Sequence, residues 1–173
     1  MGRQSRHKMS VLIFDLFLLC FLTAIDQLTK YAAVLNLKDK AAIPLINGVL
    51  EFSYLENRGA AFSMLENQKT FFVIVAGIFL CVITYVLLRT PDDKKYRHLH
   101  ILLTVIAAGA LGNMIDRLRL DYVVDFIYIS LINFPVFNVA DMFVTFATAI
   151  LVIRVLFVYE EDDFNFLALK STQ

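Results

Sequence analysis

Eight ionisable residues stand within or beside the long apolar stretches of this sequence, where a charged side chain is costly and therefore points to function. They are Asp15, Asp26, Lys30, Asp116, Arg117, Asp125, Asp141 and Arg154. Two carboxylates that lie close together cannot both ionise, so they share one proton at neutral pH. One can then deprotonate a water while the other donates a hydrogen bond to a carbonyl. Carboxylates also bind metals and relay protons, so residue type alone leaves these alternatives open.

Other catalytic residue types are poorly placed in this sequence. The histidines His7, His98 and His100 lie before or at the very start of the first and third apolar stretches, away from most of the acids, and no HExxH motif occurs. Cys20 and Cys81 lie in the middle of apolar stretches. They are predicted to be small core residues, so we expect neither a disulfide nor a metal site from them.

The segments that must position the acids are four apolar stretches, at roughly 9–34, 71–88, 99–115 and 142–159. Each is long enough to cross roughly 30 Å of hydrocarbon at about 1.5 Å per residue. The chain is 59% hydrophobic, above the roughly 45–50% of soluble domains. We predict one integral membrane domain over 1–173: an all-α bundle of four transmembrane helices, monomeric and surrounded by membrane lipid. The net charge of 0 gives no reason to expect a nucleic-acid partner.

Basic residues predict the orientation of this bundle. They crowd residues 3–8 and 89–97, and Lys and Arg gather on the cytoplasmic side of membrane proteins. Both termini are therefore predicted to be cytoplasmic, with 36–70 and 116–141 extracytoplasmic. Six of the ionisable residues then meet at the outer face: Asp26, Lys30, Asp116, Arg117, Asp125 and Asp141.

Asp15 and Arg154 lie deeper than this cluster. Asp15 is about 16 Å along a helix from Asp26, and Arg154 is about 20 Å from Asp141. Because these depths are similar, a structural ion pair between the first and fourth spans is the simplest interpretation. Snorkelling of both side chains to the inner interface is the alternative.

The two outward segments carry strand signals. Residues 43–56 hold an Asn47-Gly48 turn between apolar runs, which predicts a hairpin. Residues 122–131 are β-branched and aromatic and are followed by Asn133-Phe134-Pro135, which breaks the run. We therefore expect a small extracytoplasmic β-sheet at the outer membrane surface, forming a cradle.

Five short polar motifs occur in order along the chain. They are Asp26-Gln-Leu-Thr-Lys30, Asn57-Arg-Gly-Ala-Ala-Phe62, Gly112-Asn-Met-Ile-Asp-Arg117, Val124-Asp-Phe126 and Phe137-Asn-Val-Ala-Asp141. Together they resemble the motif set of the bacterial lipoprotein signal peptidases (signal peptidase II), and each falls where the predicted topology needs polar residues. The resemblance covers residues 26–141 and the four-span layout around them.

This resemblance implies a membrane-embedded aspartic endopeptidase of the bacterial cytoplasmic membrane that uses no cofactor. Its substrate would be a diacylglyceryl-modified prolipoprotein, cut just before the lipidated cysteine. Asp125 and Asp141 would be the catalytic pair. The residues that would bind substrate or support the pair are Asp26, Lys30, Asn57, Gly59, Asn113, Asp116, Arg117, Asn138 and Ala140.

Physical reasoning distinguishes the two implied catalytic acids. Asp141 opens the fourth span, where a helix N-terminus favours an anion, and Asp125 stands between apolar neighbours that favour the protonated form. Asp141 is therefore the expected base of the pair.

Simpler interpretations exist for the supporting residues. Asp26 and Lys30, at i,i+4, could merely neutralise each other. Asp116 could simply orient Arg117, and Asn57 could be only a turn residue.

Two other function classes use the same residue types. One is a non-enzymatic proton-coupled carrier or channel subunit, although the acids collect at one face and do not line a path across the bilayer. The other is a metal-dependent protease using Asp116, Asp125 and Asp141, for which Mg²⁺ or Mn²⁺ would suit an all-carboxylate site.

Overall fold

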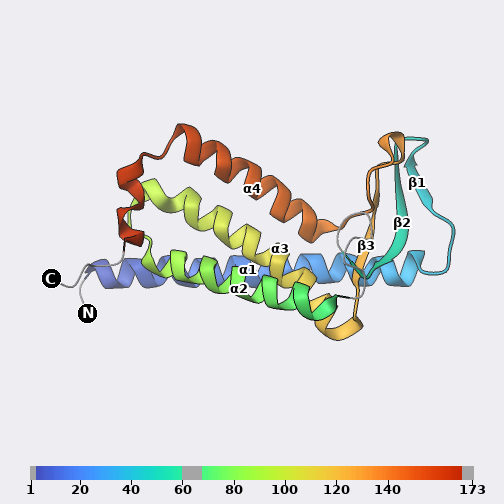
Figure 1. Ribbon diagram of the computed structural model, residues 1–173, viewed down its shortest axis with the longest axis horizontal. Helices are drawn as coiled ribbons and strands as arrows, with labels where there is room; N and C mark the ends of the chain where they lie inside the picture. The colour runs from blue at the N-terminus through green and yellow to red at the C-terminus, as the bar shows by residue number, and fades with distance from the viewer. Residues whose placement is uncertain (1–2, 60–67, 169–173) are drawn as a thin grey trace.

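The computed structural model describes residues 3–59 and 68–168. Within them, four helices are long and apolar enough to cross a membrane: α1 (Arg3–Leu37), α2 (Lys69–Arg89), α3 (Arg97–Leu120) and α4 (Val139–Phe157). Helices suit a span because every backbone N–H and C=O can be paired within the segment, as hydrocarbon requires. The prediction of a four-helix membrane bundle is confirmed, and a small sheet lies at the end of the bundle opposite the two termini (Figure 1).

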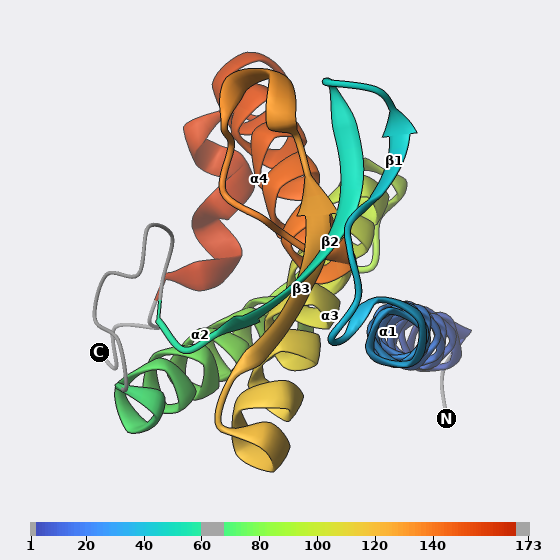
Figure 2. The same ribbon diagram turned by 90° about the vertical axis from the view of Figure 1, so that its right-hand side faces the viewer.

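The central helix of the bundle is α3. It packs against α1, α2 and α4, which surround it when the molecule is viewed from the sheet end (Figure 2). Residues such as Leu99 and Ala108 of α3 are buried, whereas large apolar side chains such as Phe17, Ile78 and Phe146 are exposed on the other helices. The outward faces of α1, α2 and α4 therefore suit contact with lipid tails.

A three-stranded antiparallel sheet caps the bundle, in the order β1 (Ile43–Ile46), β2 (Leu50–Asn57) and β3 (Val123–Tyr128). Gly48 joins β1 to β2 with a φ of +69°, a conformation that glycine adopts without strain. The predicted hairpin is therefore confirmed. The third strand ends at Tyr128, because Ser130–Ile132 turn into the short 3-10 helix η3.

The sheet is held on the bundle by an apolar contact with the end of α1. Val124 and Phe126 of β3 pack with Ala33 and Leu37 of α1 in one buried cluster. This contact fixes the strand that carries Asp125 over the ends of the helices.

The third helix continues to Leu120, past the predicted end of the span at 115, so Asp116 and Arg117 lie near its C-terminal end. One expectation about the spans is wrong, because Cys20 and Cys81 are exposed on the surfaces of α1 and α2 and are not core residues. This error has a physical cause: in a membrane bundle the lipid-facing surface is as apolar as the core, so hydropathy does not distinguish them.

The predicted ion pair between Asp15 and Arg154 is also wrong. Asp15 Oδ2 lies 2.6 Å from Nδ1 of His100, and both residues are buried. The guanidinium of Arg154 instead lies over the ring of Tyr159, 5.6 Å from its centroid. The neighbour of Asp15 on this face of α1 is therefore α3, which carries His100, and not α4.

After α4, the chain folds back onto the end of the bundle that holds the termini. The 3-10 helix η4 (Glu161–Leu167) packs beside the link between α2 and α3. Tyr96 stacks on Tyr159 and donates a hydrogen bond to the carbonyl of Asp163. This segment closes the bundle far from the acid cluster.

Candidate active site

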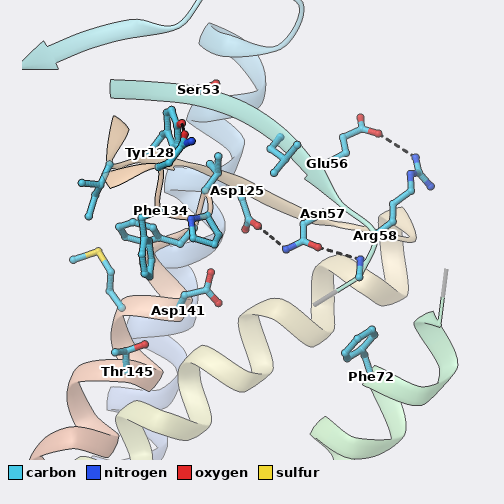
Figure 3. Close-up of a pocket in the computed structure, with 18 of the residues that line it drawn as sticks. Ser53, Glu56, Asn57, Arg58, Phe72, Asp125, Tyr128, Phe134, Asp141 and Thr145 are labelled. Carbon is cyan, nitrogen blue, oxygen red and sulfur yellow. Dashed lines mark hydrogen bonds and ion pairs between the residues drawn. The ribbon is translucent and has the colours of Figure 1, made fainter. Parts of the chain in front are cut away.

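A cavity of about 1000 Å³ opens between the sheet and the ends of the helices (Figure 3). Asp125 of β3 and Asp141 of α4 both line it, and their carboxylates point into the same space. Residues that lie far apart in the sequence complete its walls: Ser53, Leu55, Glu56, Asn57, Arg58, Gly59, Phe72, Arg117, Tyr128, Ile129, Asn133, Phe134, Pro135, Val136, Phe137, Met142, Thr145 and Phe146.

Asp125 is 1% exposed, and both of its carboxylate oxygens accept hydrogen bonds from asparagines. Asn138 Nδ2 donates to Oδ1 at 2.6 Å, and Asn57 Nδ2 donates to Oδ2 at 2.9 Å. Burial, and after it the neighbouring charge of Asp141, raises the pKa of Asp125 to about 7, although the two asparagines oppose this shift. Asp125 can therefore hold a proton near neutral pH.

Asp141 stands in the first turn of α4, where it forms a capping box with Asn138. Its backbone N–H donates to Asn138 Oδ1 at 3.0 Å, and its Oδ2 accepts the N–H of Asn138 at 3.1 Å. Asn113 Nδ2 donates to its other oxygen at 2.8 Å. These N–H donors and the helix N-terminus favour an anion at this position.

Asn113 and Asn138 connect the two acids through their amides. Asn138 Nδ2 donates both to Asp125 Oδ1 and to Asn113 Oδ1, the latter at 3.1 Å, and Asn113 in turn donates to Asp141. An asparagine whose oxygen is already accepting hydrogen bonds must direct its NH₂ elsewhere, so each amide has one defined orientation. The structure therefore brings together the four side chains that the sequence predicted to act at one site.

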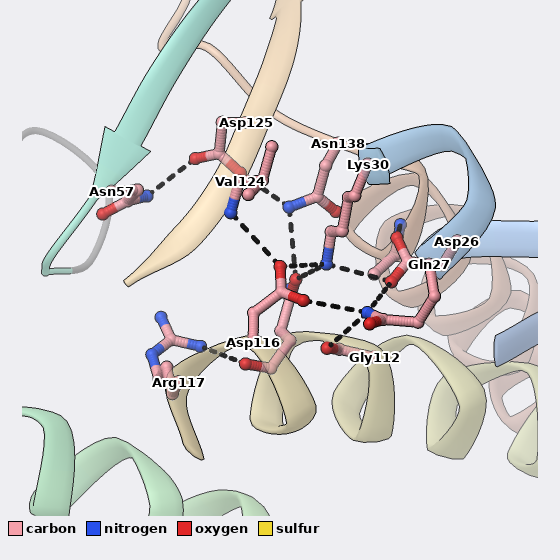
Figure 4. Close-up of polar contacts among 12 residues, drawn as sticks. Asp26, Gln27, Lys30, Asn57, Gly112, Asp116, Arg117, Val124, Asp125 and Asn138 are labelled. Atoms are coloured by element: carbon pink, nitrogen blue, oxygen red, sulfur yellow. Dashed lines mark hydrogen bonds and ion pairs between the residues drawn. The ribbon is translucent and has the colours of Figure 1, made fainter. Parts of the chain in front are cut away.

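Beneath this layer lies a buried group of charges on α1 and α3 (Figure 4). Lys30 Nζ is 2.9 Å from Asp26 Oδ2 and 3.0 Å from Asp116 Oδ2, and it donates to Asn113 Oδ1 at 2.8 Å. Asp26 and Lys30 thus do more than neutralise each other, since the lysine bridges two acids and an amide.

Arg117 lies on the α2 side of the site. Its Nη2 donates to the carbonyl of Gly59 at 3.2 Å, and its guanidinium stacks over Phe72 at 4.7 Å. Asp116 hydrogen-bonds Gln27 and the N–H of Val124 and pairs with Lys30, so it does more than simply orient Arg117. Asn57 has both roles considered for it, because its Oδ1 accepts the N–H of Gly59 while its amide reaches Asp125.

The predicted substrate contact of the second motif can be followed only in part. Its residues 57–59 border the cavity, whereas residues 60–62 lie outside the part of the chain that the structure describes.

The metal-dependent alternative required Asp116 to join Asp125 and Asp141. Asp116 is instead turned toward Lys30, Gln27 and a backbone N–H of β3. Among residues 3–59 and 68–168, no group of three or more His, Cys, Asp or Glu side chains is placed to hold a metal ion.

The arrangement of this site agrees with comparisons to known proteins. Residues 18–157 match the family model described as signal peptidase (SPase) II. The chain belongs to the signal peptidase II family. It is 38% identical to the lipoprotein signal peptidases of two strains of Streptococcus pyogenes, serotype M5 (Manfredo) and serotype M18 (MGAS8232), over 85% of this chain and 93% of each relative.

Solved structures agree with this membership. Two structures of bacterial membrane enzymes, determined by the in meso method at 2.3 and 1.9 Å resolution, superpose with TM-scores of 0.75 and 0.74 at 30% sequence identity. The first covers 83% of this chain and 87% of its own, and the second covers 84% and 94%. As a signal peptidase II, this protein is a membrane protease.

Two contributors to the site were not singled out from the sequence. Gln27 lies inside the first motif, and its amide contacts Asp26, Asp116 and the carbonyl of Gly112. A polar residue within an apolar span was the signal that could have identified it. Gly109 of α3 could not have been found in this way, since its role is steric: a Cβ there would lie 2.5 Å from the carbonyl oxygen of Ala140.

Proposed function

We propose that this protein is an aspartic endopeptidase that removes the signal peptide from diacylglyceryl-modified prolipoproteins, cutting just before the lipidated cysteine, with Asp125 and Asp141 as its catalytic pair. The observation that carries the proposal is the pairing of these two carboxylates on one cavity, Asp125 buried on a strand and Asp141 in the first turn of a helix, in a chain of the signal peptidase II family. No covalent intermediate is required.

The two environments assign complementary roles to the pair. Asp141, at a helix N-terminus and hydrogen-bonded by Asn113 and Asn138, is the carboxylate that deprotonates the attacking water. Asp125 carries the shared proton, in keeping with its raised pKa, and donates a hydrogen bond to the scissile carbonyl. When the tetrahedral intermediate collapses, the proton taken by the pair passes to the departing amine.

The cavity walls suit a peptide that bears lipid. On the sheet side they offer polar groups, including Asn57, Arg58 and Ser53, and on the helix side they are apolar at Phe72 and Phe146. An extended peptide along β2 would bring its diacylglyceryl group toward the helices and the surrounding lipid. The hairpin of β1 and β2 would then act as the cradle over the peptide.

The topology forms part of the proposal. The sheet and the acid cluster lie at the end of the bundle away from the termini (Figure 1). With the basic residues of 3–8 and 89–97 in the cytoplasm, both termini are cytoplasmic and the active site is extracytoplasmic. One chain contributes all the residues invoked in the reaction, so we propose that the protein acts as a monomer.

A single reaction tests this function. The purified protein in detergent should cleave a diacylglyceryl-modified lipobox peptide before the modified cysteine and should leave the unmodified peptide uncut. A chelator should have no effect, and Asp125→Asn and Asp141→Asn should each lose nearly all turnover while still binding the peptide. Cleavage at a near-normal rate by either variant would remove that residue from the pair, and chelator-sensitive cleavage would favour the metal-dependent alternative.

The carrier alternative has a separate outcome. A proton-coupled carrier would leave both peptides intact. The structure gathers most of the acids at one end of the bundle and pairs the deeper Asp15 with His100. A proton path across the bilayer would need acids spread along the bundle, so this arrangement does not favour a carrier.

A further inference from the structure

The backbone N–H groups just before the two catalytic aspartates are each held by a buried carboxylate. The N–H of Val124, which precedes Asp125, donates to Asp116 Oδ2 at 3.2 Å. The N–H of Ala140, which precedes Asp141, donates to Asp26 Oδ1 at 3.0 Å. Each acid of the proposed pair thus follows a residue whose backbone N–H is held by a second acid.

These two carboxylates are also joined to each other. Lys30, which is 3% exposed, lies between them at 2.9 Å from Asp26 and 3.0 Å from Asp116. Gln27 Nε2 makes a second bridge, at 3.2 Å from Asp26 Oδ2 and 2.9 Å from Asp116 Oδ1. The two tethers therefore belong to one rigid unit built on α1 and α3.

We propose that Asp26, Gln27, Lys30 and Asp116 form a positioning unit that sets the separation of Asp125 and Asp141 by holding the backbone of β3 and of the first turn of α4. This rests on the proposed function, since it concerns the geometry of that catalytic pair. None of the four residues touches the reacting atoms.

The need for such a unit follows from where the pair comes from. Asp125 is on a strand and Asp141 is on a helix. The local chain joins them through Asn138, which donates to Asp125 and caps the helix of Asp141, and through backbone hydrogen bonds between Ile127 and Phe137. The positioning unit adds a tether from α1 or α3 to the residue before each acid. A proton-sharing pair works only within a narrow range of separation, and a misplacement of about 1 Å can cost about 10²-fold in rate. Hydrogen bonds to charged carboxylates are stronger than neutral ones, which makes them suited to hold this geometry.

Lys30 has a second effect on the pair through Asn113. Because Asn113 Oδ1 accepts from Lys30 at 2.8 Å, its amide nitrogen must face Asp141. The unit therefore fixes both the backbone of the catalytic aspartates and the orientation of an amide that bonds one of them.

Substitutions at Asp116 distinguish the effect of its hydrogen bond to the N–H of Val124 from the effect of its negative charge. Asp116→Ala removes the acceptor for the N–H of Val124, and we expect kcat to fall about 10²-fold with KM within about twofold of the parent. Asp116→Asn keeps an acceptor for that N–H but loses the charge, and should retain most of kcat. Asp26→Ala and Asp26→Asn, at the tether to Ala140, should behave in the same way.

The pH dependence of the rate is a second measurement, and it would not change if Asp116 only stabilised the fold. The charged groups facing the pair are Asp26 and Lys30 of α1, Asp116 and Arg117 of α3, Glu56 of β2, and Arg58, which directly follows β2. Removing the negative charge of Asp116 favours ionisation of the pair, so the acid limb should move to lower pH in both the Asn and the Ala variant. If the Ala variant does not fold, Asp116→Glu takes its place: it keeps the charge but moves the acceptor, so kcat should fall with the acid limb unchanged.

The matched control is Asp15→Asn, which alters another buried acid of α1 that is paired with His100 away from the site. It should change neither kcat nor the pH profile of the folded protein. Equal losses of kcat in the Ala and Asn variants, or unchanged kcat in both, would overturn the positioning proposal. Those results differ from failure of the proposed function, in which Asp125→Asn and Asp141→Asn would themselves remain active.

Discussion

Replacing Gly112 by alanine adds one methyl group where α3 meets the carboxylate of Asp26. A Cβ at Gly112 would lie 2.3 Å from Asp26 Oδ2, more than 1 Å short of the 3.4 Å at which ordinary van der Waals contact begins. The other close neighbour, the Cβ of Ala140, lies at 3.6 Å, within ordinary contact, so the carboxylate is the part that must move. A displacement of that size would break the 3.0 Å hydrogen bond from the N–H of Ala140 to Asp26 Oδ1.

The size of the effect follows from this displacement. Loss of the tether frees the first turn of α4, which carries Asp141, and a shift of about 1 Å in a catalytic group costs about 10²-fold in rate. That factor corresponds to about 2.7 kcal/mol of transition-state stabilisation. Overpacking should also lower the free energy of unfolding by about 1–3 kcal/mol, less the roughly 1 kcal/mol that alanine gains over glycine in a helix.

Gly77→Ala is the matched control for this experiment. Gly77 lies in α2, and a Cβ there meets nothing within 4 Å, so the substitution brings the same gain in helix propensity without the clash. Both variants are compared with the parent for kcat and KM on the lipidated peptide in detergent and for their thermal unfolding midpoints. A Gly112→Ala protein whose kcat stays within about twofold of that of Gly77→Ala would refute the reasoning.

Three further predictions concern pH, buried charge and topology. Burial, and next a neighbouring carboxylate, raises the pKa of Asp125 from 3.8 to about 7, so the stability linked to its protonated form is lost as the pH rises through about 7. Asp125→Asn should therefore raise the unfolding midpoint more at about pH 8 than at about pH 5, and an equal rise at both would contradict this. His100→Leu should lower the midpoint by leaving Asp15 unpaired, whereas Asp15→Leu with His100→Leu should recover it with kcat unchanged; a double variant as unstable as the single would count against the pair. An impermeant thiol reagent added to intact cells should label a cysteine at position 38, replacing Lys38, but not one replacing Lys95, and labelling of only the latter would invert the topology.

The spans and the positions of the polar motifs could be predicted from the sequence because they depend on local properties. A span needs only enough consecutive apolar residues, and a hairpin needs a turn residue such as Gly48 between apolar runs. The acids stood out because ionisable groups are rare in apolar stretches. For the same reason the six polar residues at one end of the bundle were expected to meet before any tertiary structure was considered.

The partners of these residues could not be predicted in this way. The choice of His100 over Arg154 as the partner of Asp15 depends on which helix lies beside α1, and hydropathy carries no such information. The exposure of Cys20 was missed for a related reason, since lipid and protein core favour the same side chains.

The sequence by itself determined that this chain crosses a membrane four times and that its acids gather at one end, since both follow from the order of apolar and polar residues along the chain. The resemblance had already implied Asp125 and Asp141 as the pair, but only the tertiary structure decided that these two line the cavity while Asp26 and Asp116 lie beneath it. The division depends on the rotation of each helix and on two backbone N–H groups, those of Val124 and Ala140. Every residue other than proline carries such a group, so no side-chain pattern can mark the two that are held.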